Sequence, residues 1–192
     1  MKRVVVVALA LAALPALAQT STWKIDPSHA HSSFTVRHLV ITNVRGEFGK
    51  TEGTLVLDEG DVTRSKVEAT IDVASIDTRE PKRDEHLKSA DFFDVERFPH
   101  IRFVAKEIAR DGAGLRLVGD FTLRGVTQLV TFSISGGQHA KDSQGRARVG
   151  YCATGRISRK AFGVSWNAVY EGGSVVVGDE VELLLDLQLI PR

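Results

Sequence analysis

The sequence predicts an all-β domain of about eight to ten antiparallel strands, closed as a barrel or packed as a sandwich. Two observations predict this class. Apolar and polar residues alternate along most segments, and clusters of Gly, Asp and Asn separate these segments at hairpin-like intervals. Each strand therefore has one apolar and one polar face, whereas strands buried on both sides would be apolar throughout.

The N-terminal residues predict export. A basic start, "MKR", precedes the apolar run "VVVVALALAALPALA", which ends in the small-x-small pattern Ala16-Leu17-Ala18. This pattern is typical of a cleaved signal peptide, and the run is short for a membrane span. We expect residues 1–18 to be removed and residues 19–192 to form a single periplasmic domain. An uncleaved anchor is the alternative.

Charge and cysteine content narrow the function classes. Without Lys2 and Arg3, the 25 basic residues become 23, against 24 acidic ones. A nucleic-acid-binding protein would normally carry a basic excess, so we expect no nucleic-acid partner. Cys152 is the only cysteine, so no internal disulfide can form and the domain must be held together by its core.

Period-two alternation identifies the strands in chain order. The segments and their apolar-face residues are "SSFTVRHL" (Phe34, Val36, His38), "GTLVLDEG" (Leu55, Leu57), "SKVEATIDVASID" (Val67, Ala69, Ile71, Val73), "LRLVGDFTLRG" (Leu115, Leu117, Phe121, Leu123), "QLVTFSISGG" (Val130, Phe132, Ile134), "RARVGYCATGRI" (Val149, Tyr151, Ala153) and "GDEVELLLDLQL" (Val181, Leu183, Leu185, Leu187, Leu189).

The inward positions combine large and small side chains. A barrel of about eight strands is either filled by its own side chains or holds one ligand. Small inner residues can leave room for a ligand, or can simply complement the large residues opposite. The large residues are Phe34, Phe48, Phe121 and Phe132, and the small ones are Ala69, Gly119, Ala153 and Gly155.

The segment "RDEHLKSADFFDVERFPHIRF" interrupts the alternation. Helix-forming residues run from 78 to 89, where Asp77-Thr78 can cap a helix and Pro81 is tolerated in its first turn. Three aromatic residues follow, and Pro99 ends any helix before the next strand. We interpret this segment as a short helix and an aromatic loop that cap one end of the barrel, rather than as an acid/base site.

Metal binding is the main chemical alternative. His29 and His31 lie on one face of an extended segment, a spacing that can chelate a metal, and His38, His86, His100 and His139 are further candidates. No His-Glu-x-x-His or Cys/His framework completes a tetrahedral site, and the Gly-x-Ser-x-Gly and P-loop motifs are missing. We therefore predict no metal site, no cofactor and no catalytic residue.

The motifs resemble those of the YceI-like family over essentially all of residues 19–192. The matching segments are "WKIDPSHAHSSFTVRHLVITNVRGEFG", "ASIDTREPKRDEHLKSADFFDVERFPHIRF", "GDFTLRGVTQLVTFSI", "GYCATGRISRKAFGV" and "GDEVELLLDLQL". The resemblance implies an antiparallel, lipocalin-like β-barrel with a polyisoprenoid lipid, such as an isoprenoid quinone or a prenyl phosphate, in an internal tunnel. It implies a binding or carrier role and no settled catalytic activity.

On this basis we expect the following residues to bind the lipid. The predicted tunnel lining is Phe34, Val36, His38, Phe48, Ile71, Val73, Phe121, Phe132, Tyr151, Phe162, Leu183 and Leu185. The predicted mouth is Leu87, Phe92, Phe93 and Phe98, with Arg79, Arg83, His86 and Lys88 as headgroup contacts. Transient membrane contact and a homodimer are compatible with this role. The alternatives are a metal-assisted enzyme acting on such a lipid and a filled barrel that binds a protein partner.

Overall fold

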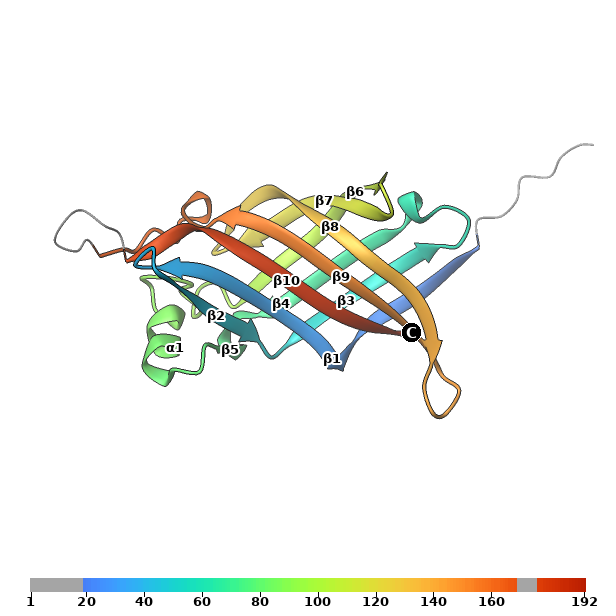
Figure 1. The fold of residues 1–192 in the computed structure, drawn as a ribbon, viewed down its shortest axis with the longest axis horizontal. Helices are drawn as coiled ribbons and strands as arrows, with labels where there is room; N and C mark the ends of the chain where they lie inside the picture. The colour runs from blue at the N-terminus through green and yellow to red at the C-terminus, as the bar shows by residue number, and fades with distance from the viewer. Residues whose placement is uncertain (1–18, 169–175) are drawn as a thin grey trace, which may run out of the picture.

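The pairing of the first strand with the last closes the sheet into a barrel. The computed structural model describes residues 19–168 and 176–192. Eight antiparallel strands follow one another around the barrel in the order β1-β3-β4-β6-β7-β8-β9-β10, and β10 pairs again with β1 (Figure 1). The predicted antiparallel barrel is confirmed, and the sandwich alternative is wrong.

The elements have the following bounds. The strands are β1 (Thr20–His38), β2 (Thr42–Phe48), β3 (Thr51–Asp58), β4 (Lys66–Asp72), β5 (Ile76–Asp77), β6 (His100–Asp111), β7 (Gly114–Leu123), β8 (Val126–Lys141), β9 (Ala147–Ser158) and β10 (Val177–Pro191). The one α-helix of the described residues is α1 (Pro81–Lys88), and three 3-10 turns are η1 (Val62–Arg64), η2 (Val73–Ser75) and η3 (Arg159–Phe162).

Along one edge, strand β1 pairs with two different strands. Its first residues, 20–24, pair with β3, whereas residues 32–38 pair with β2, which in turn pairs with the short β5. Between these halves the register with β10 shifts, from Ile25 to Ala30. The irregular residues bend the strand, as bulges do, so that β2 and β5 extend beyond the closed barrel at the end where α1 lies (Figure 1).

Alternation along the strands places the core inside the barrel. One cluster of buried side chains lies toward the α1 end and is rich in aromatic residues, including Phe48, Phe121 and Phe132. A smaller cluster around Trp23 and Val149 fills the opposite end. Within residues 19–168 and 176–192, no helix is long and apolar enough to span a membrane.

Helix α1 begins one turn later than the expected cap. Its N-cap is Glu80, whose side chain accepts from Lys82 N, and Pro81 follows it as predicted. The prediction that Asp77-Thr78 caps the helix is wrong, because Thr78 is bonded instead to the buried carboxylate of Asp84. That carboxylate accepts from Thr78 N at 2.9 Å and from Thr78 Oγ1 at 2.5 Å.

The Thr78–Asp84 contact generates a stability prediction. Asp84→Ala leaves two donors of Thr78 without their acceptor, so we expect the free energy of unfolding to fall by about 1–3 kcal/mol in urea titrations. The neighbouring Glu85 is exposed and pairs only loosely with Lys88, so Glu85→Ala changes stability by less than about 0.5 kcal/mol. Equal effects of the two substitutions would show that the contact does not hold α1 in place.

Candidate functional site

Three apolar cavities lie in series inside the barrel. The proximal cavity, at the α1 end, has a volume of about 90 Å³, the central one about 110 Å³ and the distal one about 120 Å³. The proximal and central cavities share the lining residues Phe48, Ile101, Phe121 and Leu183. The central and distal cavities share a second set, whereas the proximal and distal cavities share none, so their order along the barrel is settled.

The second shared set contains the small residues of the middle of the barrel. Its members are Val67, Ala69, Leu117, Ala153 and Leu187. Sequence reasoning expected one tunnel, but the structure divides the interior into three spaces. A hydrocarbon chain running along the barrel axis would require the dividing side chains to change rotamer.

The predicted aromatic cap closes the proximal cavity. Leu87 of α1 and the loop residues Phe92 and Phe93 line it. The ring centroid of Phe92 lies 5.0 Å from that of His86 and 5.1 Å from that of Trp166. The cap is therefore an aromatic assembly that shields the end of the barrel from water.

The inner glycines accommodate aromatic rings. A Cβ atom at Gly119 would lie 2.5 Å from the ring of Phe103, and one at Gly155 would lie 2.8 Å from the ring of Phe132. At these two positions the small residue complements a large neighbour rather than leaving room. The room that remains lies beside Ala69 and Ala153, which line the central and distal cavities.

Arg159 places a cation at the wall of the proximal cavity. Its side chain is only 4% exposed. Nε donates to Gly178 O at 2.8 Å, Nη1 donates to Val164 O at 2.7 Å and to Trp166 O at 2.9 Å, and Nη2 donates to Val177 O at 3.1 Å. A guanidinium has five N–H donors, so one N–H of Nη2 has no acceptor among the described residues.

The charge of Arg159 is balanced mainly by carbonyl dipoles. Burial lowers the pKa of Arg159, and the carboxylate of Asp179 acts in the opposite direction. Arginine nevertheless stays protonated in proteins. Asp179 is itself bonded to Ser158 Oγ and to Lys160 N, and no ion pair joins it to Arg159 in the described part of the chain. An apolar cavity therefore has one buried positive group on its wall.

Most of the residues predicted to bind lipid line one of the cavities. Around the proximal cavity these are Phe34, Val36, Phe48, Leu87, Phe92, Phe93, Phe121 and Leu183, and around the central cavity also Ile71, Phe132 and Leu185. Tyr151 lines the distal cavity. Contact of these residues with a ligand remains a prediction.

Four of the predicted apolar or polar lining residues lie away from the cavities. Val73 and Phe162 are buried in the core behind the walls, and Phe162 packs edge-on against Phe121 at 5.6 Å. Phe98 covers Gly125, and His38 ends strand β1. Of these four residues only His38 lies on a strand, so alternation does not report the placement of the other three, which lie in turns or loops.

The four predicted headgroup contacts lie outside the three cavities. Arg83 donates from Nε to Thr78 Oγ1 at 2.7 Å, and His86 Nε2 lies 2.9 Å from the carboxylate of Asp91. Arg79 is exposed, with a φ of +63°, and Lys88 pairs loosely with Glu85. None of these four side chains lines the three cavities.

The structure adds lining residues that the sequence prediction missed. The proximal cavity also includes Leu123, Ile157 and Val164, and above all Arg159. The signal for Arg159 is present in the sequence, since it continues the inward series 151, 153, 155 and 157.

His29 and His31 lie outside the barrel. Both are exposed beside a surface groove, and His29 Nδ1 lies 3.0 Å from Asp26 Oδ2 in the irregular part of β1. The hydrogen bond with His29 lowers the pKa of Asp26, and bonds from Ser28 N and Gln188 Nε2 act in the same direction. Within the described residues, no three His, Cys, Asp or Glu side chains gather as metal ligands would.

Comparison with known proteins now identifies the family. A family model described as the YceI-like domain matches residues 23–189. The chain belongs to the YceI-like family. A UPF0312 protein of Serratia proteamaculans is 38% identical over 160 residues, covering 82% of each chain. A UPF0312 protein of Staphylococcus aureus (strain USA300) is 32% identical over 163 residues, covering 84% of this chain and 93% of the relative.

Several solved structures share the fold. BcnA of Burkholderia cenocepacia superposes with a TM-score of 0.75 at 24% identity, covering 85% of this chain and 98% of that one. The YCEI protein of Campylobacter jejuni gives 0.68 at 25% identity, with coverages of 81% and 89%. A polyisoprenoid binding domain from Saccharophagus degradans gives 0.63 at 11% identity, with coverages of 88% and 98%.

The buried guanidinium of Arg159 generates the second prediction. Arg159→Met removes a side-chain donor from four carbonyl groups, of which Val177 O keeps a second donor in Asn167 Nδ2, so we expect the free energy of unfolding to fall by about 3 kcal/mol or more. Arg156, near the end of the preceding strand β9, is exposed and pairs with Glu180 and Glu182. Arg156→Met should therefore cost less than about 1 kcal/mol. Urea titrations of both variants test this, and similar losses would contradict the role assigned to Arg159.

Proposed function

We propose that the protein is a periplasmic binding or carrier protein for a polyisoprenoid lipid, such as an isoprenoid quinone or a prenyl phosphate. The observation that carries the proposal is the series of three apolar cavities along the axis of a closed barrel. Barrels of this size hold at most one small ligand or an extended chain. A flexible hydrocarbon with regular branches fits a narrow interior whose walls are almost wholly apolar.

The energetics of burial support a lipid tail. Each methylene equivalent removed from water contributes about 0.8 kcal/mol. A tail of several isoprene units therefore gains far more than the cost of ordering the chain and restricting its motion. An apolar wall distinguishes tail lengths poorly, because one methylene is worth only about 1–3 kcal/mol. The length of the natural tail accordingly depends on the length of the path rather than on specific contacts.

Arg159 gives the proposed binding site a direction. It is the only charged side chain on the wall of the proximal cavity, among the described residues, and it lies at the α1 end. A phosphate or a quinone oxygen near the Arg159 Nη2 N–H that has no acceptor among the described residues would gain a charge-assisted hydrogen bond. We therefore place the lipid headgroup at the proximal cavity and the tail through the central cavity toward the distal one.

The polar groups of the central cavity favour binding over catalysis. Ser32 Oγ is hydrogen-bonded to Thr51 Oγ1 at 2.8 Å, and Ser33 Oγ donates to Leu184 O at 3.1 Å. Both hydroxyls are thus used in holding strands together. A nucleophilic serine would instead be paired with a general base.

The family agrees with the proposed ligand class. The domain from Saccharophagus degradans, which has the same fold, is described as polyisoprenoid-binding. The periplasmic location rests on the signal-peptide pattern of residues 1–18, which lie outside the described residues.

Ala153 offers a direct test of the path. It lines both the central and the distal cavity, so the ring introduced by Ala153→Phe obstructs their junction. We expect saturable binding of octaprenyl phosphate to weaken at least about tenfold, or about 1.4 kcal/mol. Geranyl phosphate, which is short enough to stay near the proximal cavity, should bind with unchanged affinity. Equilibrium binding of both radiolabelled lipids provides the measurement.

Thr154→Phe is the matched control for this substitution. Thr154 is the next residue of β9 and is exposed on the outer wall, so the same ring is added without entering the barrel. The control should bind both lipids as the wild type does. Undiminished binding of the long lipid to Ala153→Phe would mean that the tail does not pass through the barrel.

A further inference from the structure

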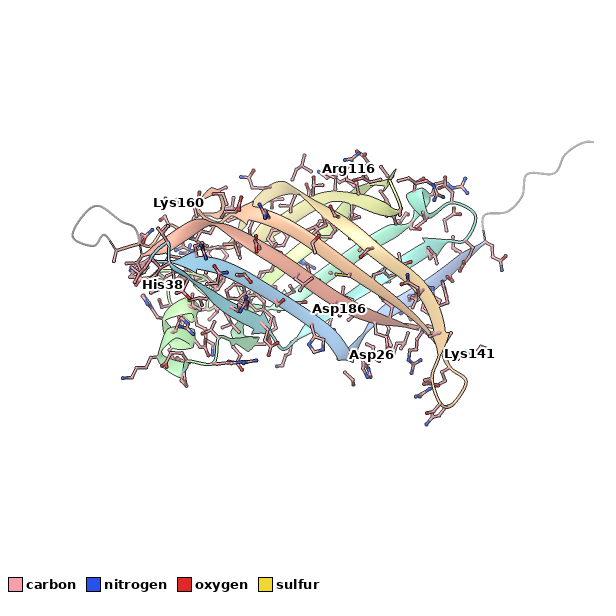
Figure 2. All side chains as sticks on the ribbon, in the orientation of Figure 1. Asp26, His38, Arg116, Lys141, Lys160 and Asp186 are labelled. Atoms are coloured by element: carbon pink, nitrogen blue, oxygen red, sulfur yellow. The ribbon has the colours of Figure 1, made fainter. Side chains whose placement is uncertain are left out.

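The turn between β1 and β2 exposes apolar side chains at the α1 end of the barrel. We call Leu39, Val40 and Ile41 the β1–β2 tip. Val40 is 64% exposed and Ile41 is 80% exposed, although both are large hydrophobic residues. Figure 2 places His38, the last residue of β1, at the same end of the molecule as Lys160. The tip thus places two adjacent exposed apolar side chains at this end of the molecule.

The backbone of the tip is strained for its sequence. Ile41 N donates to His38 O at 3.2 Å, and the two residues between them have positive φ angles, +52° at Leu39 and +63° at Val40. This is the geometry of a type I′ turn, which strongly favours Asn-Gly. A β-branched residue with positive φ is unusual, and such strain is found mainly where it serves a function. In the β1–β2 tip, the strained turn also exposes apolar side chains.

Cations lie beside the tip. Arg37 on β1 donates to Asn43 Oδ1 at 3.0 Å, and Arg45 lies on β2. Both arginines are exposed, and neither forms an ion pair with a carboxylate in the described part of the chain. The nearby carboxylates of Glu180 and Glu182 are occupied by Arg156. Among the described residues, the strands on either side of the apolar tip thus carry two arginines that form no ion pair.

The tip adjoins the proximal cavity. Val36, three residues before Leu39, lines that cavity, and so does Val177 on β10. Leu39 N also donates to Val176 O at 2.8 Å, which ties the tip to the start of β10. A surface that contacts the tip therefore lies close to the end of the cavity series that carries Arg159.

We propose that the β1–β2 tip is a membrane-docking element that inserts into the interface of a bilayer containing anionic lipids. A few apolar side chains flanked by arginines suit such an interface, because the apolar groups enter the acyl boundary and the cations meet lipid phosphates. A stable protein interface would require about 800 Å² from each partner, far more than three side chains provide. The proposal does not require that the barrel hold a lipid.

Flotation with lipid vesicles tests the proposal. The purified protein, in the form its own host produces, should float with vesicles of phosphatidylethanolamine and phosphatidylglycerol. Binding should weaken at high salt or with phosphatidylcholine alone, because lipid charge is then screened or absent. Val40→Ser combined with Ile41→Ser should lower the affinity for the anionic vesicles at least about tenfold.

A turn-optimised variant separates docking from folding. Leu39→Asn combined with Val40→Gly installs the preferred type I′ sequence, so we expect Tm to rise by about 2–4 °C while vesicle binding falls. A variant that was merely damaged would lose both. Leu129→Ser is the matched control, since Leu129 is 66% exposed on the outer wall of β8 and should not affect vesicle binding.

Three results would overturn the proposal. The first is a wild-type protein that does not float with the anionic vesicles. The second is an equal loss of binding in Leu129→Ser, which would place the contact elsewhere on the barrel. The third is a wild-type dimer that the tip substitutions convert to a monomer without any change in flotation, which would make the tip a contact between copies. Binding of prenyl lipids in solution is measured separately and is not affected by any of these outcomes.

Discussion

The hydrogen-bonded pairing of β1 with β10 is the constraint on which the rest of the structure depends. It runs from Trp23 to His38 along β1 and turns an open sheet into an eight-stranded barrel. Closure fixes the width of the interior, which then admits either interlocking side chains or a narrow ligand. It also removes the free edges that would otherwise favour aggregation. The bend after Ile25 allows the second half of the same strand to pair with β2, which lies next to the aromatic cap.

Within that fixed width, the arrangement of large and small residues decides where space remains. Phe103 and Phe132 occupy the positions freed by glycines, so the interior is not hollow throughout. The alanines at positions 69 and 153 have no such ring against them in the same way, and cavities lie beside them. The aromatic cap closes one end, and Arg159 supplies a single buried charge there. The interior thus has an apolar path, and the buried charge of Arg159 distinguishes its capped end.

Much of this architecture was predictable from the sequence, because alternation reports directly which side of a strand is buried. The strands and lining residues such as Phe48 and Leu183 follow from that signal, whereas the capping helix follows from the helix-forming residues between positions 78 and 89. Residues in turns lie outside that signal: Phe162, in the 3-10 turn η3, was expected to line a cavity but packs beside the lining residue Phe121. Arg159 was missed for a different reason. The carbonyl groups that satisfy it belong to residues 164–178, and their convergence depends on the tertiary fold.

The central claim is that the barrel interior houses a hydrocarbon chain, and native mass spectrometry tests it most directly. The protein would be purified without detergent from its own host, and its mass would be recorded before and after extraction with organic solvent. The account predicts one additional mass for each protein molecule, removed by the solvent and identified in the extract as a prenyl lipid. A protein that carries no such lipid, and takes none up when saturated with polyprenyl phosphate, would contradict it.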